Sequence, residues 1–315
     1  MTIKRSSDSL SILGGANNTM HKNPKTEANN ISKALRLVLG GECIPVDIQG
    51  LVVEWSNNVC PEEPILGVKS VPLPNFEGML VKSPRGNGWM IGVNDQMESE
   101  GRIRFTIAHE FGHYILHRDV QEKFECSNQD MHSWGSQVRA MEAEADTFAS
   151  YLLMPLDDFR RQIEGQKLSF DLLRHCADRY GVSLTAAALK WREIAPGRAI
   201  VLSAKDGFLD WSCSNKRAFQ TGAYFATKNS SIEVPAGSLL LDATRSATGH
   251  FRRIPASTWF PKESSDVFIE EHAFVVEGGD FSYVLGVLLL PEIDVRLNED
   301  EDVALEPLTG RPTFI

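Results

Sequence analysis

The chain has 315 residues, 42% of them hydrophobic, so it can bury a sizeable core and is expected to form about two domains. Its formal net charge of −10, from 32 basic and 42 acidic residues, argues against broad, non-specific binding of nucleic acid. No apolar run reaches the roughly 18 residues of a membrane span, and no apolar signal-peptide core is present at the N-terminus. The five cysteines are scattered without a Cys-x-x-Cys pair. This favours a reduced, cytoplasmic protein in which each cysteine is a small buried hydrophobe.

The first part of the chain predicts a polar tail, one helix and a small sheet. Residues 1–26 are rich in Ser, Asn and Lys with little periodicity, which is typical of a disordered tail. From Glu27 apolar residues recur at helical spacing until Gly40 ends the helix. The apolar runs that follow, with a Gly-Asn-Gly hairpin turn at 86–88, predict a turn and strand at 45–55 and further strands at 66–71, 76–82 and 89–94.

Helices are expected to dominate the middle of the chain. Apolar spacing predicts a helix over 99–116 and another over 138–154. The polar, irregular residues 119–135 between them predict a surface loop. Residues 156–195 hold shorter helices, including a helix–Gly turn–helix pattern in which Ser183 is a candidate N-cap.

At Pro196 the residue pattern changes from helical spacing to short strand-like runs, which predicts a further domain. Residues 196–295 contain short apolar or alternating runs separated by polar turns, which indicates a mostly β domain with a candidate sensor or substrate-binding role. Residues 296–315 form an acidic tail that we expect to be solvated. The fold class is therefore α+β, with a small sheet plus helices over 27–155, a helical extension over 156–195 and the β-rich domain after it. The expected strands of that domain are 199–202, 237–241, 267–276 and 283–290.

The chemistry is concentrated in a His-Glu-x-x-His motif on the helix predicted at 99–116. His109 and His113 are four residues apart, so on a helix they lie about 6 Å apart along the axis and point from nearly the same face. Two imidazoles in this arrangement can bind one zinc ion. Glu110 is offset from that face, so it can reach a water on the metal without being a ligand.

A catalytic zinc site needs a third protein ligand, and the sequence offers several. His117 is disfavoured because a continuous helix places it about 12 Å from His109 along the axis. Glu142, on the next predicted helix, can complete a His₂Glu site. Asp146 lies one turn beyond and is placed to accept the other ring N–H of a ligand histidine. Glu144 points to the other side, where we expect it to be solvated, and stays a weaker alternative ligand.

The sequence resembles the ImmA/IrrE family of regulatory metallopeptidases. Residues Arg104–His117 (RFTIAHEFGHYILH) are similar to the family's zinc helix, and Glu142–Pro155 (EAEADTFASYLLMP) to its second signature. The resemblance covers about residues 27–195. It implies a minimal zincin-like metallopeptidase domain over 27–155, to which the helical extension is added.

The resemblance also implies roles for individual residues. The family's metal ligands correspond to His109, His113 and Glu142, and its catalytic residue corresponds to Glu110. Family members are cytoplasmic and commonly cleave, or relieve, a helix-turn-helix repressor, so that stress-response or mobile-element genes are expressed. Some carry a C-terminal sensor-like domain. The expected partner is therefore a protein substrate such as a transcriptional repressor, with no membrane and no direct contact with nucleic acid.

Several alternatives remain open at the level of sequence. The expected activity is zinc-dependent peptide hydrolysis, although Mn²⁺ or Fe²⁺ would also suit a His₂-carboxylate site. The alternative function is a DNA-binding regulator that uses residues 170–192, or a metal sensor, acting without proteolysis. The group that stabilises the oxyanion is not assigned among Tyr114, His117 and His132.

Overall fold

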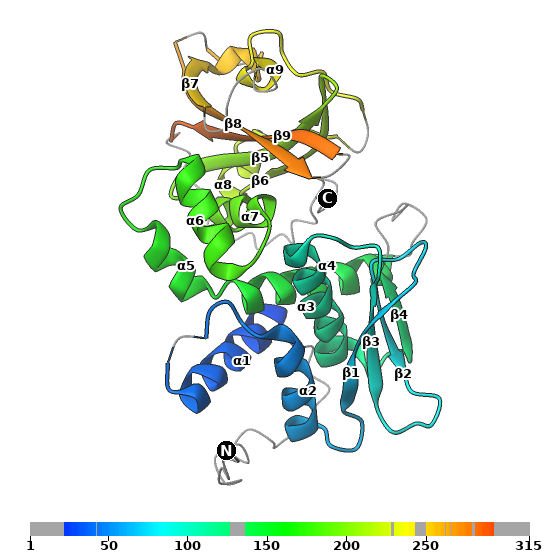
Figure 1. Ribbon diagram of the computed structural model, residues 1–315. Coiled ribbons are helices and arrows are strands. Elements are labelled where there is room, and N and C mark those ends of the chain that lie inside the picture. Colours follow the sequence, from blue (N-terminus) through cyan, green and yellow to red (C-terminus); the bar gives the residue numbers. More distant parts are fainter. Residues whose placement is uncertain are drawn as a thin grey trace. The chain divides into compact units, whose positions relative to one another are not determined.

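The computed structural model describes residues 22–41, 43–126, 136–227, 230–242, 250–261, 263–264, 266–278 and 281–292. The chain forms two compact units, each with its own sheet (Figure 1). One unit comprises Met1–Leu156 and Tyr180–Val182, and the other Asp157–Arg179 and Ser183–Ile315. A helical region is followed by a C-terminal sheet, which confirms the α+β class. Of the tail predicted at 1–26, residues 1–21 lie outside the described residues, whereas 24–26 belong to a helix, so the prediction is wrong there. The tail predicted at 296–315 lies outside the described residues.

Two helices open the first unit. Helix α1 (Pro24–Leu39) begins after Asn23, whose side chain accepts a hydrogen bond from the Thr26 amide, and ends at Gly40 with φ of 70°. The predicted strand within 45–55 is wrong, because Ile48–Val59 forms helix α2. Asp47 caps α2 by accepting a hydrogen bond from the Gly50 amide. The β-branched residues there suggested a strand, but their burial follows helical spacing.

The first unit's sheet has four strands in the order β1-β3-β2-β4. The strands are β1 (Ile65–Val71), β2 (Gly78–Lys82), β3 (Trp89–Asn94) and β4 (Lys123–Cys126). Strand β1 runs parallel to β3, whereas β2 is antiparallel to both β3 and β4. Strand β4 lies inside the region predicted as a surface loop, so that prediction is wrong for Lys123–Cys126. Four residues are too few for periodicity to identify a strand that is held only by its long-range partner.

Two long helices lie beside this sheet (Figure 1). Helix α3 (Glu100–His117) packs against β2 and β3, and α4 (Ser136–Leu153) packs against α3. Their close approach depends on Gly112, because a Cβ there would lie 3.1 Å from the Ala145 Cα and 3.2 Å from the Phe148 ring. The glycine and the small alanine bring the two helix backbones together where the motif residues stand.

The second unit begins with three short helices, α5 (Leu156–Ile163), α6 (Phe170–Tyr180) and α7 (Leu184–Ile194). Ser183 accepts a hydrogen bond from the Ala186 amide at 3.1 Å, which confirms the predicted N-cap of α7. Buried Asp158 accepts hydrogen bonds from the Arg161 and Arg179 guanidinium groups. The pair with Arg179 joins α5 to α6, whereas that with Arg161 lies within α5.

The rest of the second unit is an antiparallel sheet in the order β6-β5-β9-β8-β7. Asp206 and Gly207, both with positive φ, form the two-residue turn between its first two strands, the geometry of a type I′ hairpin. The mostly β region is thus confirmed, but the run at 237–241 is not a strand, because a short helix begins at Leu239. The strands are β5 (Arg198–Lys205), β6 (Phe208–Ser214), β7 (His250–Pro255), β8 (Phe268–Gly278) and β9 (Phe281–Leu290), and the helices are α8 (Lys216–Gln220), α9 (Leu239–Asp242) and a single 3-10 turn at Ala256–Thr258.

One face of this sheet carries a buried carboxylate, that of Glu271, which accepts several hydrogen bonds. Glu271 of β8 is fully buried and accepts hydrogen bonds from Ser238 Oγ, the Leu239 amide and Trp259 Nε1 at 2.6 to 2.7 Å. Three donors offset the cost of burying the charge and attach the start of α9 to the strand. Within the described part of the chain, no helix is long and apolar enough to cross a membrane.

Candidate metal centre

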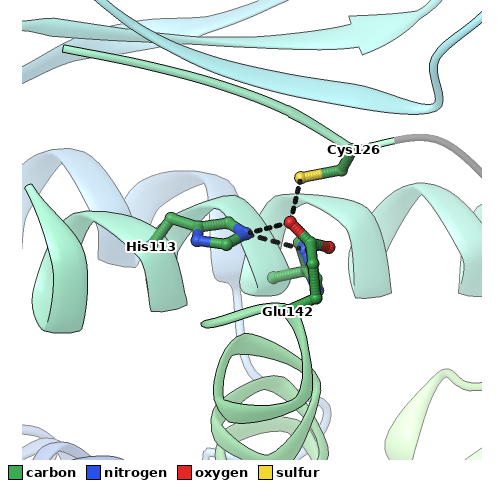
Figure 2. A group of neighbouring side chains, drawn as sticks. His113, Cys126 and Glu142 are labelled. Atoms are coloured by element: carbon green, nitrogen blue, oxygen red, sulfur yellow. Dashed lines mark hydrogen bonds and ion pairs between the residues drawn. The ribbon is translucent and has the colours of Figure 1, made fainter. Parts of the chain in front are cut away.

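Four potential metal ligands meet where α3, α4 and the end of β4 come together. They are His109 and His113 on α3, Glu142 on α4 and Cys126 on β4, and their ligand atoms all lie within 4.8 Å of one another. Each side chain is buried, with 0% to 7% of its surface exposed. Figure 2 shows the His113 ring and the Cys126 sulfur both directed at the Glu142 carboxylate.

The separations within this cluster fit a single tetrahedral metal. The two histidine Nε2 atoms are 3.1 Å apart, and they lie 3.3 Å (His109) and 3.2 Å (His113) from the nearer oxygens of Glu142. Zinc bonds to N and O of about 2.0–2.1 Å imply ligand–ligand distances of roughly 3.3 Å around a tetrahedron. Three side chains predicted from the sequence as ligands are thus placed at the spacing that such a metal requires.

Each histidine of the pair also contacts a second group through its other ring nitrogen. His109 Nδ1 lies 2.8 Å from Asp146 Oδ1, the contact expected from the sequence. His113 Nδ1 lies 3.1 Å from His117 Nδ1, and His117 Nε2 lies 2.9 Å from Glu144 Oε2. If His113 binds metal through Nε2, its Nδ1–H donates to His117, whose Nε2–H donates to Glu144. These contacts hold both rings in the orientation and tautomer that metal binding requires.

The position of Glu144 corrects the expectation that this residue is solvated. Only 24% of its side chain is exposed, and its carboxylate contacts His117 rather than water alone. The angle around the helix axis places Glu144 on a different side from Asp146. Its side chain is nevertheless long enough to contact His117. His117 itself is not among the grouped ligands, in keeping with the argument from helix geometry.

Electrostatics in the metal-free cluster distribute the protons unequally. Burial on its own disfavours a charged His109, but hydrogen bonds to Asp146 and Glu142 outweigh it and raise its pKa to about 10. Burial lowers the pKa of His113 to about 4, so this ring is neutral at pH 7. Burial also opposes ionisation of Glu142, yet its hydrogen bonds to the two histidines hold its pKa below the usual range. In the metal-free cluster Glu142 is therefore ionised and His113 neutral, the forms in which these groups bind metal, whereas His109 carries a proton that metal binding must displace.

Glu110 lies on the side of α3 that faces the sheet and is fully buried. A Cβ at Gly78 of β2 would lie 2.5 Å from Glu110 Oε1 and 2.5 Å from Thr106 Cγ2. Only glycine at that position leaves room for the carboxylate, so the sheet fixes where Glu110 stands relative to its helix neighbours.

The two oxyanion candidates that lie among the described residues contact other groups of the chain. The Tyr114 hydroxyl donates to the Glu63 carbonyl oxygen at 2.9 Å, and His117 bridges His113 and Glu144. His132 lies outside the described residues.

Cys126 is the cluster member that the sequence did not single out. Its Sγ lies 3.8 Å from Glu142 Oε1, and it comes from the strand that was predicted as loop. The available signal was weak: in Lys123–Cys126, charged residues alternate with Phe124 and Cys126, which are the two buried positions. Phe124 stacks on the His113 ring with centroids 4.6 Å apart, so the buried face of β4 is the face toward α3.

The four residues of this cluster lie within a region that matches a known protein family. Residues 66–192 match the family model of the M78 peptidases, described as the IrrE N-terminal-like domain, which confirms the resemblance to the ImmA/IrrE family. Among solved structures, a Mycobacterium tuberculosis transcriptional regulator aligns over 84% of this chain and 76% of its own, with a TM-score of 0.51 and 13% sequence identity. At that identity the likeness is one of fold. No curated protein sequence gives a match.

Proposed function

Because residues 66–192 form an IrrE N-terminal-like domain of the M78 peptidase family, we propose that this protein is a zinc-dependent endopeptidase acting on a protein substrate in the cytoplasm. The observation that carries the proposal is the convergence of His109, His113 and Glu142 at tetrahedral spacing, with Glu110 one residue from the first of them. Zinc bound there supplies Lewis acidity that activates water and polarises the scissile carbonyl. Mn²⁺ and Fe²⁺ are the alternatives that a His₂-carboxylate set also accepts.

The remaining chemistry belongs to side chains of this chain. Glu110 takes a proton from the attacking water and passes it to the leaving amine, the role of a general base and then acid. Asp146 and His117 hold the two histidine rings in orientation through their Nδ1 contacts. Burial of the cluster excludes bulk solvent, which strengthens each of these electrostatic interactions.

The substrate we propose is a helix-turn-helix transcriptional repressor. Support comes from the family resemblance and from the fold shared with a protein described as a transcriptional regulator. Cleavage of the repressor would release its target genes, so the protease would act as a regulator of transcription.

Direct binding to DNA by α6 and α7 has less support. The two helices and the turn at Gly181 have a helix-turn-helix arrangement, but α7 packs on β5 and most of its residues are buried. Thr185 of α7 also hydrogen-bonds to the Tyr283 hydroxyl at 2.6 Å. A recognition helix must present its exposed face to the major groove of DNA. Salt-dependent DNA binding by the purified protein would support this alternative function.

The test compares the wild type with Glu110→Gln, a change that keeps the ligands and removes the base. Each protein is co-expressed with any helix-turn-helix repressor encoded near its gene, and fragments are mapped by mass spectrometry. We expect a defined cleavage with the wild type, none with Glu110→Gln, and equal metal content in both. Equal cleavage by the two proteins would refute the proposed function.

A further inference from the structure

The thiol of Cys126 occupies a position that a metal in the cluster would reach. Its Sγ belongs to the group of ligand atoms within 4.8 Å, and its 3.8 Å separation from Glu142 Oε1 is close to the roughly 3.5 Å expected between S and O ligands on one tetrahedral zinc. The sulfur points toward the carboxylate of Glu142 (Figure 2). Its neighbours are thus ligand atoms, unlike those of a cysteine that only fills space.

The sheet register explains why the thiol points inward. Cys126 pairs directly with Gly78 across the antiparallel β2–β4 ladder, and the Glu77 amide donates to the Cys126 carbonyl oxygen at 3.0 Å. Residues opposite one another in such a ladder direct their side chains to the same face. The Cβ direction of Gly78 leads to Glu110 on α3, so the Cys126 side chain is directed to that helix as well.

The contact between the thiol and the carboxylate is one that a shared metal would replace. Without metal, the Cys126 thiol donates a weak hydrogen bond to Glu142 Oε1 at 3.8 Å. Metal binding would displace that proton and make both groups ligands of one ion.

We propose that Cys126 is a fourth protein ligand that closes the metal centre, giving a resting state with two histidines, one glutamate and one cysteine. Structural zinc sites have four protein ligands, whereas catalytic sites keep one position for water. Hydrolysis at this centre, which rests on the proposed function above, therefore requires Cys126 to leave the metal first. The soft thiolate also favours zinc over manganese.

The position of β4 makes such a release feasible. It has four residues and lies at the edge of its sheet, where β2 is its only partner among the described residues. The other three ligands are carried by α3 and α4, so a displacement of the end of β4 moves Cys126 alone among the four. An arriving peptide that adds to this sheet edge would displace the thiol as it binds.

Cobalt substitution tests the ligand directly. The metal-free full chain is titrated with Co²⁺, and a thiolate-to-cobalt charge-transfer band is sought in the near ultraviolet. We expect the band in the wild type and in Cys43→Ala, whose thiol lies outside the cluster. Cys126→Ala should lose the band while still binding Co²⁺. Its zinc affinity, measured by chelator competition, should fall by at least the roughly 10–100-fold that loss of an outer contact costs.

X-ray absorption and the cleavage assay together distinguish a failure of this inference from misfolding of a variant and from a failure of the proposed function. X-ray absorption at the zinc edge of the wild type alone should show one sulfur at about 2.3 Å, without recourse to any variant. Metal bound with no sulfur and no charge-transfer band overturns the role of Cys126 but leaves the peptidase proposal standing. A sulfur ligand together with cleavage that survives Glu110→Gln supports Cys126 and overturns the peptidase proposal.

Discussion

Adding one methyl group at Gly78 should displace the proposed base while leaving every metal ligand in the sequence. In Gly78→Ala the new Cβ would lie 2.5 Å from Glu110 Oε1 and from Thr106 Cγ2, whereas ordinary contacts begin at 3.4 Å. The shortfall is therefore about 0.9 Å, and part of it must be taken up by the carboxylate, because Thr106 is β-branched and held in a helix. The three atoms nearest to the new Cβ belong to Glu110 and Thr106, and none belongs to His109, His113 or Glu142.

The size of the effect follows from that displacement. A misplacement of about 1 Å in a catalytic group lowers turnover about 100-fold, equivalent to about 2.7 kcal/mol in the activation barrier. Overpacking of this kind also costs about 1–3 kcal/mol of stability. We therefore expect a folded Gly78→Ala protein with unchanged metal content and a repressor cleavage rate about two orders of magnitude below the wild type.

Gly67→Ala is the matched control for this experiment. Gly67 lies in β1 of the same sheet, and a Cβ there would meet no atom within 4 Å. Both variants are assayed by single-turnover cleavage and by urea unfolding, so that lost activity is separated from lost structure. Cleavage by folded Gly78→Ala at the rate of Gly67→Ala would refute the assignment of Glu110 as the base positioned against β2.

The other predictions concern the groups around the metal and the second unit. Asp146→Ala and Glu144→Ala should each lower zinc affinity by about 10–100-fold in chelator competition, although neither residue is a ligand; unchanged affinity would contradict the orienting role. Metal-free protein should be most stable near pH 6.5 by urea unfolding. The stabilisation from His109 is complete below pH 6.5 and is lost as pH rises toward its pKa of about 10, whereas that from His113 is complete above pH 6.5 and is lost as pH falls toward its pKa of about 4. Stability that rises steadily from pH 4 to 10 would contradict this account. Glu271→Ala should lower the free energy of unfolding by about 3 kcal/mol, because it leaves buried donors without their acceptor; a change below about 1 kcal/mol would show that water replaces the carboxylate.

Local periodicity was sufficient to predict the parts of the site that lie on long helices. The four-residue spacing of His109 and His113 has the same consequence on any α-helix, and a carboxylate one helical turn from a second acid indicated Glu142 and Asp146. The structure places all four where that reasoning expected them. Apolar spacing also predicts most strands. The β-branched start of α2 predicts a strand as well, because the sequence does not show that its buried residues follow helical spacing.

What periodicity could not supply is the contribution of β4. Its four residues form a strand only because they pair with β2, more than forty positions earlier in the chain, and no local pattern encodes that pairing. Without it, the predicted site has three ligands and an open position, the arrangement of an active peptidase. With Cys126 opposite Gly78, β4 adds a fourth potential ligand to the three on the helices. The choice between an open and a closed centre thus depends on one edge-strand pairing, which is where control of the reaction is expected to act.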